Sequence, residues 1–177
     1  MNKLDNFQTK RMAAERLGPE HFEFVFQMHQ DKEIMAYLGG KRSRRQTRGY
    51  MAFALDHWQK YGYGIWILRE IGTGLFVGRG GLRNAILKGK EEIEVAYGFM
   101  PQFWNKGLAT ELVETLVRIG LTDLKLSGLV CVTHPDNTAS QRVMTKTGFQ
   151  YESELIYKHK PHLLYRYQHR IPQTNIR

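Results

Sequence analysis

The sequence predicts an α+β fold with a mixed sheet, in which helices flank strands that are mostly antiparallel. Short apolar runs separated by glycine-containing turns fill residues 65–100, which is typical of an antiparallel meander. A helical pattern, an apolar strand and a second helix follow, and a crossover of that kind places two strands parallel. The length of 177 residues fits a single domain, with a core from about residue 9 to about residue 170.

The N-terminal third is predicted to contain one strand followed by helices. The strand covers residues 9–16, and Pro19 suits the first turn of the helix that follows. Apolar residues recur with helical spacing in residues 22–28 and again in residues 34–38, where Gly39 and Gly40 end the segment. Ser43 is a candidate N-cap for a third helix, whose apolar residues extend to Trp58.

The remaining elements are strands and helices in alternation. Strands are predicted at residues 65–69, 75–82 and 92–100, with turns at 71–74 and 87–90. Residues 108–119 have the spacing of an amphipathic helix, and the apolar residues 129–132 suit a strand covered on both faces. A capped helix begins after Asn137, and strands near residues 151–156 and 163–170 complete the order.

The sequence is strongly basic, which predicts an anionic partner. Lys and Arg number 26 against 17 Asp and Glu, and the formal charge is +9. This balance favours nucleic acid, an anionic membrane surface or a phosphate-rich small molecule as partner. The densest basic segment is residues 41–48, for which a solvated helix start and an RNA or ribosome contact both remain open.

Composition also excludes several classes of protein. Cys131 is the single cysteine, which excludes an internal disulfide framework, and its apolar strand favours a small buried side chain over a nucleophile. His159 and His162 have no further ligand residue at metal-binding spacing, so no metal is expected. Residues 1–10 lack the apolar core of a signal peptide, and no segment approaches the roughly 18 apolar residues of a membrane span. We therefore expect a cytoplasmic protein with no membrane partner.

The strand at residues 92–100 presents two different faces to its surroundings. Glu94 lies on the same face as Ala96 and Gly98, opposite a row of larger apolar residues. A carboxylate beside two small residues leaves open space, which makes Glu94 the preferred candidate for acid–base chemistry over Glu92. The alternatives are a solvated carboxylate or an ion pair with an arginine such as Arg83.

The turn that joins this strand to the next helix is a predicted anion site. Unpaired N–H groups at a helix start and the helix dipole both favour a bound anion. Gly107 has no Cβ, so a ligand can approach the backbone closely there. Neither GxxxxGK[ST] nor GxGxxG occurs at this turn, and an ordinary strand-to-helix connection is the alternative interpretation.

The same segment carries a family resemblance. Trp104-Asn105-Lys106-Gly107-Leu108-Ala109-Thr110-Glu111 resembles the acetyl-CoA pyrophosphate loop of the GNAT N-acetyltransferase superfamily, whose pattern is Gln/Arg-x-x-Gly-x-Gly/Ala. Trp104 stands at the first position, which is typical of the RimJ/RimL-like branch that acetylates ribosomal-protein N-termini. Asn137-Thr138-Ala139-Ser140 resembles the N-x-x-S signature of that branch, and residues 144–149 resemble its L-x-K-x-G-F ending. The resemblance covers about residues 9–170 and implies a GNAT-like fold with the parallel strand pair at the cofactor site.

The resemblance implies an acetyl-CoA-dependent N-acetyltransferase and assigns roles to particular residues. Glu94 would orient or deprotonate the amine through water, and a backbone N–H near Phe99 or Met100 would polarise the thioester carbonyl. The pyrophosphate contacts would come from Asn105, Lys106, Gly107, Leu108, Ala109 and Thr110. Asn137 would bind the cofactor, and Ser140 would bind it and donate to the leaving sulfur, although both residues are also favoured helix caps. Met144 stands where many members of the superfamily have a tyrosine.

The expected acceptor is a protein N-terminal α-amine or a small primary amine. An α-amine has a pKa of about 7.7–8.0, so a modest base suffices near neutral pH. A longer acyl-CoA in place of acetyl-CoA is a weaker alternative. The competing hypothesis is a non-catalytic RNA- or ribosome-binding protein with the same fold. A monomer and a homodimer are equally compatible with the sequence.

Overall fold

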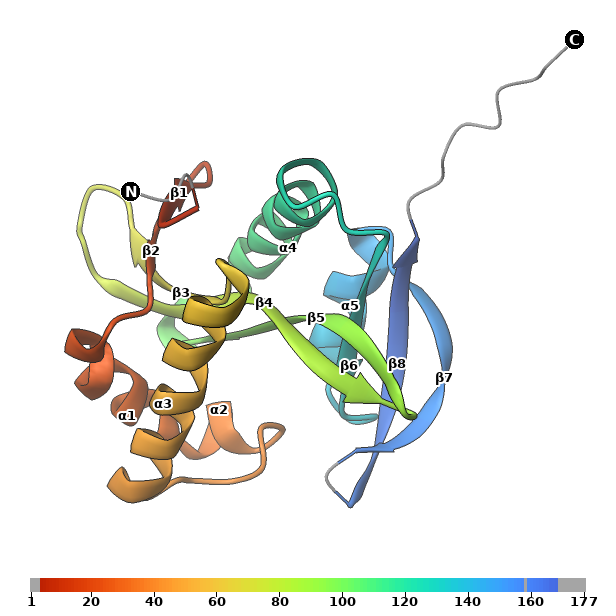
Figure 1. The fold of residues 1–177 in the computed structure, drawn as a ribbon. Coiled ribbons are helices and arrows are strands. Elements are labelled where there is room, and N and C mark those ends of the chain that lie inside the picture. Colours follow the sequence, from red (N-terminus) through yellow and green to blue (C-terminus); the bar gives the residue numbers. More distant parts are fainter. Residues whose placement is uncertain (1–3, 158, 169–177) are drawn as a thin grey trace, which may run out of the picture.

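A computed structural model describes residues 4–157 and 159–168, and these residues form an eight-stranded sheet with helices on both faces (Figure 1). The strands lie in the order β1-β2-β3-β4-β5-β6-β8-β7, and all neighbours are antiparallel except β5 and β6. The predicted mixed fold with one parallel pair is therefore confirmed. The strands are β1 (Asn6–Gln8), β2 (Met12–Arg16), β3 (Ile65–Glu70), β4 (Phe76–Leu87), β5 (Lys90–Phe99), β6 (Gly128–Thr133), β7 (Gln150–Tyr157) and β8 (Lys160–Gln168). The helices are α1 (Phe22–Gln30), α2 (Lys32–Met35), α3 (Arg44–Tyr61), α4 (Leu108–Arg118) and α5 (Thr138–Lys146).

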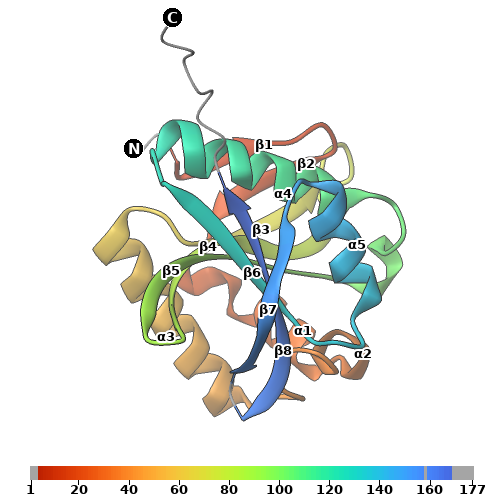
Figure 2. The ribbon, with the colours of Figure 1, turned by 90° about the vertical axis from the view of Figure 1, so that its right-hand side faces the viewer.

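Helices cover the two faces of the central strands in separate groups. A Cβ added to Gly98 of β5 would meet Met28 of α1, whereas one added to Gly80 of β4 would meet Leu112 of α4. Gly80 pairs with Tyr97, the neighbour of Gly98, so the two glycines lie on opposite faces of the sheet. In Figure 1, α1, α2 and α3 gather together and apart from α4, and Figure 2 shows α4 and α5 beside β6. The face that holds Glu94 and Gly98 is thus the face of α1 to α3.

The start and end of the longest helix follow from local sequence. The Ser43 side chain accepts a hydrogen bond from the Gln46 N–H at 3.2 Å, and the Gln46 side chain accepts one from the Ser43 N–H at 2.8 Å. This reciprocal cap confirms Ser43 as the N-cap of α3. The helix ends at Gly62, which has the left-handed φ of 71° that favours glycine.

The prediction of one strand at residues 9–16 is wrong in detail. Two short strands, β1 and β2, pair antiparallel, with Phe7 opposite Ala14. A tight turn separates them, because the Thr9 hydroxyl accepts from the Met12 N–H at 3.0 Å and the Thr9 N–H donates to the Met12 carbonyl at 2.8 Å. Polar residues that were assigned to a strand therefore form the connection.

Several other boundaries differ from the prediction, among them those of β4 and β8. β4 continues to Leu87 because the turn needs only Lys88 and Gly89, whose φ angles are 49° and 77°. β8 begins at Lys160, three residues before the predicted position. The predicted residues 169–170 of that strand lie outside the described residues.

The aromatic side chains of α3 and β3 belong to the core. Trp58 and Trp66 are 1% and 0% exposed, and their ring centroids are 4.9 Å apart in an edge contact. Each indole N–H donates to a backbone carbonyl, that of Trp58 to Ile65 and that of Trp66 to Leu4. These rings pack the interior and do not line an acceptor site. Among the described residues, every helix is too short or too polar to cross a membrane.

Candidate active site

A cleft of about 770 Å³ opens where β5 and β6 diverge. The two strands are paired at one register position, Glu94 opposite Val130, and β5 continues to Phe99 beyond it. The walls come from the segment between α2 and α3, from α3, from β4 to β6, from the start of α5 and from the β7–β8 hairpin. The predicted residues Glu94, Asn137 and Ser140 all line this one cleft, although they come from separate elements.

Glu94 is fixed in the wall of the cleft by its cross-strand partner Arg83. Glu94 is 4% exposed, and its Oε2 accepts from Arg83 Nε at 2.9 Å and lies 2.8 Å from a second guanidinium nitrogen. The negative charge of Glu94 raises the pKa of Arg83 and outweighs the opposing effect of burial. The ion pair that the sequence left as an alternative is therefore present, and it lies inside the cleft. Glu92 is paired elsewhere, with Arg166 at 2.8 Å.

The end of β5 directs one backbone amide toward the cleft side of the strand. The Met100 N–H donates to the Val77 carbonyl at 2.8 Å, so it is occupied within the sheet. Because amides alternate in direction along an antiparallel ladder, the Phe99 N–H faces away from β4, toward the gap beside β6. The Phe99 carbonyl faces the same way and accepts from the Trp104 indole at 2.7 Å. Of the two predicted amides, that of Phe99 faces the opening.

The start of α5 lies across the cleft from Glu94. Asn137 caps this helix, because its side chain accepts from the Ser140 N–H at 3.1 Å. The Ser140 hydroxyl lies 3.0 Å from the hydroxyl of Tyr97 on β5. Burial raises the pKa of Tyr97, so its phenol remains protonated. Met144, at the position where many relatives have a tyrosine, is fully buried in the core.

Tyr97 is a cleft residue that the sequence analysis missed. The alternation along β5 places Tyr97 on the face opposite Glu94, and it was grouped there with apolar side chains. The opening between β5 and β6 exposes both faces of the strand to one cavity, so residues of both faces line it. The alternation along β5 therefore predicts the face on which Tyr97 lies. Only the separation of β5 from β6 brings that face into the cleft.

The predicted anion loop has a helix start without a side-chain cap. Asn105 and Gly107 adopt left-handed φ angles of 58° and 75°, and Gly107 is the N-cap of α4. The Glu111 N–H donates to the Gly107 carbonyl at 3.2 Å, so the first intrahelical bond begins there. The N–H groups of residues 108–110 precede that bond and have no partner within the helix. They are available to an anion at the end of the helix dipole.

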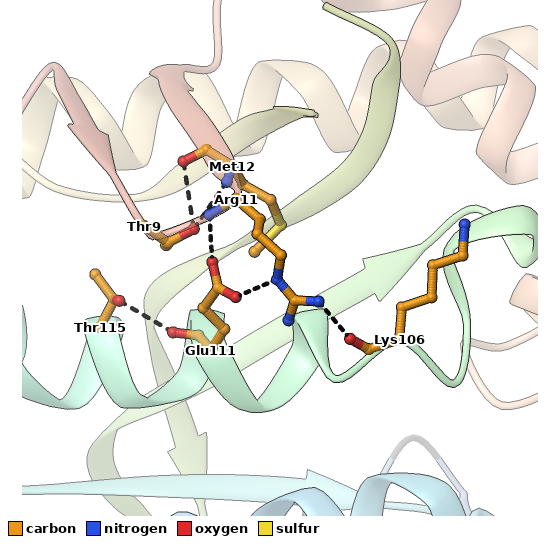
Figure 3. Close-up of polar contacts among 6 residues, drawn as sticks. All are labelled: Thr9, Arg11, Met12, Lys106, Glu111 and Thr115. Atoms are coloured by element: carbon orange, nitrogen blue, oxygen red, sulfur yellow. Dashed lines mark hydrogen bonds and ion pairs between the residues drawn. The ribbon is translucent and has the colours of Figure 1, made fainter. Parts of the chain in front are cut away.

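Arg11, at the start of β2, holds this loop in place (Figure 3). Its guanidinium donates to the Lys106 carbonyl at 2.7 Å and to Glu111 at 2.7 Å, and its own N–H donates to Glu111 at 2.7 Å. Partial burial would raise the pKa of the Glu111 carboxyl, but hydrogen bonds from Thr9 and Arg11 and the Arg11 charge lower it. No sequence pattern indicates Arg11, because it lies 100 residues from Glu111.

Two remaining predictions concern Cys131 and metal binding. Cys131 is 3% exposed, and burial raises its pKa, so it is a thiol on the cleft wall. Within the described ranges, no group of three or more His, Cys, Asp or Glu is arranged to hold a metal ion.

Comparisons with known proteins agree with this fold. Residues 11–150 match the family model described as an acetyltransferase (GNAT) domain, and the chain belongs to this family. YoaA of Bacillus subtilis, an N-acetyltransferase by name, is 28% identical over 151 residues, which cover 84% of each chain.

Solved structures also resemble the chain. An acetyltransferase from Agrobacterium tumefaciens superposes with a TM-score of 0.82 at 21% identity, covering 94% of this chain and 95% of that one. The ribosomal L7/L12 α-N-protein acetyltransferase RimL, in complex with coenzyme A, has a TM-score of 0.75 at 15% identity, covering 90% and 95%. The predicted GNAT fold and enzyme class, N-acetyltransferase, are thereby confirmed.

Proposed function

We propose that the protein transfers the acetyl group of acetyl-CoA directly to a primary amine, most favourably a protein N-terminal α-amine or otherwise a small-molecule amine. The observation that carries this proposal is the cleft between the diverging strands, which is lined by Glu94 and Tyr97 of β5 and by Ser140 at the start of α5. A thioester inserted between β5 and β6 would meet an acid–base group on each side. The helix start of α4, which is proposed to bind an anion, follows β5 after the short helix at Pro101–Phe103.

The cofactor would be held mainly by backbone groups. The N–H groups of residues 105–110 are proposed to bind the pyrophosphate, because they lie at an uncapped helix start beside the left-handed Gly107. Asn137 and Ser140, at the start of α5, would contact the cofactor near the thioester. The coenzyme A complex of the RimL neighbour supports this choice of cofactor.

Glu94 is proposed to act on the amine. Both contacts with Arg83 use Oε2, and none of the described residues donates a hydrogen bond to Oε1. Oε1 would therefore accept a proton from the amine through water, as nitrogen attacks the thioester carbon. The carbonyl oxygen would gain negative charge in this step, and the Phe99 N–H would donate to it.

We propose that two hydroxyl groups in series stabilise the leaving sulfur by hydrogen bonding. As the new C–N bond completes, the C–S bond breaks and its electron pair leaves with the sulfur. Ser140 would donate a hydrogen bond to the thiolate, and the Tyr97 hydroxyl at 3.0 Å would donate in turn to Ser140. The Tyr97 phenol stays protonated, so it can donate to Ser140 while Ser140 donates to the sulfur.

Calorimetry with acetyl-CoA and assay of thiol release with amine acceptors test the proposal. We expect acetyl-CoA to bind and peptides with a free α-amine to gain an acetyl group detectable by mass spectrometry. Gly107→Val is expected to weaken acetyl-CoA binding about tenfold or more, because a side chain would block the approach to the loop. Gly89→Val is the matched control, since it carries the same left-handed strain (φ 77° against 75°) in the β4–β5 turn. Absence of acetyl-CoA binding at millimolar ligand would refute the function.

A further inference from the structure

The residues that line the cleft carry more positive than negative charge. Its ionised lining residues are Arg42, Arg79, Arg83 and Lys160 on the basic side and Glu94 on the acidic side. Glu94 already forms an ion pair with Arg83. The other guanidinium groups in the wall, those of Arg79 and Arg42, have no carboxylate within ion-pair distance among the described residues.

Arg79 is the most unusual member of this set. It is 6% exposed, and its Nε has no hydrogen-bond partner among the described residues. Its guanidinium lies 4.7 Å from the ring centre of Tyr50, whose buried hydroxyl also has no partner there. A buried charge without a counter-charge is strongly unfavourable, and proteins retain such groups mainly at sites where a ligand compensates them.

The groups around Arg79 increase the positive potential. The Arg42 guanidinium lies 5.5 Å from the same Tyr50 ring, and burial together with the Arg79 charge lowers the pKa of Arg42. His29, beneath this ring at 5.1 Å, is neutral because burial and the two arginine charges lower its pKa to about 3. Two cations and two unpartnered donors thus converge on one side of the cleft.

The cofactor phosphates do not account for this charge. Arg79 and Arg83 are four residues apart on β4, so both lie on the face of Glu94, which α1 to α3 cover. The helix start of α4 lies against the opposite face, where Leu112 contacts Gly80. The arginine side chains on this face therefore lie in the part of the cleft that the cofactor phosphates leave open to the acceptor.

We propose that Arg79, Arg42 and the Tyr50 hydroxyl form a carboxylate subsite for the acceptor. Arg79 and Arg83 are four positions apart on β4, about 13 Å along a strand, and Glu94 lies opposite Arg83. A carboxylate held by Arg79 would therefore lie well apart from Glu94, the group proposed to act on the amine. The acceptor class is a peptide N-terminus with an acidic side chain at its second or third residue, rather than a free α-amino acid or a polyamine. This inference rests on the proposed function.

Binding of acetylated product peptides to the CoA-saturated protein tests the subsite without requiring turnover. The probes are N-acetyl-Ala-Glu-Gly-amide and its glutamine counterpart, compared by calorimetry. We expect the acidic peptide to bind about tenfold or more tightly than the neutral one, as charge-assisted hydrogen bonds predict. Arg79→Met should abolish the preference, whereas Lys160→Gln, which removes an exposed cleft charge, should retain most of it.

A second measurement separates a ligand site from a structural arginine. If Arg79 serves a ligand, Arg79→Met should unfold at an equal or higher temperature than the wild type, because an uncompensated charge is removed. A lower unfolding temperature for Arg79→Met, together with a retained preference for the acidic peptide in Arg42→Gln, would overturn the proposal. Equal binding of the two peptides to the wild type would overturn it as well. Failure of the proposed function can be told apart from failure of the subsite. In the first case the acidic peptide would still bind selectively, although no acceptor is acetylated.

Discussion

Glu94 combines a structural contact with the geometry expected of a catalytic group. Its Oε2 neutralises Arg83, and its side chain forms part of the cleft wall. The ion pair holds the carboxylate in one orientation, which a solvated side chain would not keep. A residue in this position can accept a proton only if Oε1 remains directed toward the acceptor, so the pair with Arg83 is a condition of the proposed chemistry and not a competing explanation.

Replacing Glu94 by glutamine tests this interpretation. Glu94→Gln keeps the shape and the hydrogen bond with Arg83 but removes the proton acceptor, so turnover is expected to fall about 10²- to 10⁴-fold. The affinity for acetyl-CoA, measured by calorimetry, should remain within about twofold of the wild type. Glu92→Gln is the control, because it alters another arginine-paired carboxylate of β5 outside the cleft. An unchanged rate for Glu94→Gln over the whole pH range would remove Glu94 from the mechanism.

The helix start of α4 depends on a strand from the other end of the chain. Gly107 and Asn105 supply the backbone conformation of the loop, but Arg11 ties the loop to β2 through the Lys106 carbonyl and Glu111 (Figure 3). A loop that binds pyrophosphate through its amides benefits from being fixed before the ligand arrives. In the proposed function, Arg11 would therefore be a positioning residue for the cofactor loop.

Arg11→Ala is expected to raise the dissociation constant of acetyl-CoA about 5- to 20-fold, because charged hydrogen bonds that order the loop are lost. Arg11→Lys should recover part of the affinity, since it keeps the charge but not the two-pronged geometry. Arg44→Ala removes a comparably exposed arginine that pairs with Glu23 away from the cleft, and it serves as the control. Equal affinities for Arg11→Ala and Arg44→Ala would contradict the positioning role.

The elements also show which features could be predicted from the sequence. Ser43 and the loop at Gly107 carry their structure in a few neighbouring residues, so capping and turn rules were sufficient for them. The contacts of Arg11 with Glu111 and of Arg79 with Tyr50 join residues that are far apart in sequence. Pattern rules describe single elements, and the packing of one element on another decides which distant side chains meet.

The basic charge of the whole molecule divides into groups with different roles. In the segment of residues 41–48, Arg42 lines the cleft, whereas Arg44 pairs with Glu23 and lies 4.9 Å from the Phe22 ring. Arg48 lies 5.7 Å from the same ring. The segment is therefore not one uniform basic surface. The charge of +9 suggested nucleic acid first, but its buried part points to a small anionic group within the cleft.

Burial of the His29 imidazole makes the stability of the fold depend on pH. The imidazole is 0% exposed, and its Nδ1 lies 2.9 Å from the Thr47 hydroxyl. Burial, and then the charges of Arg79 and Arg42, lower its pKa from 6.5 to about 3. In the unfolded chain the group regains its ordinary pKa, so the unfolded state binds a proton that the folded state rejects between those values.

The free energy of unfolding is therefore expected to be fully retained above pH 6.5 and to decrease as the pH falls toward 3. The loss from His29 is at most about 1.4 kcal/mol per pH unit. Urea unfolding from about pH 7 to about pH 5 measures it, above the range where carboxyl groups titrate. His29→Gln should show a smaller loss than the wild type, and the residual slope would come from His57, whose pKa burial also lowers. If both proteins lose stability equally, His29 does not keep a lowered pKa in the folded state.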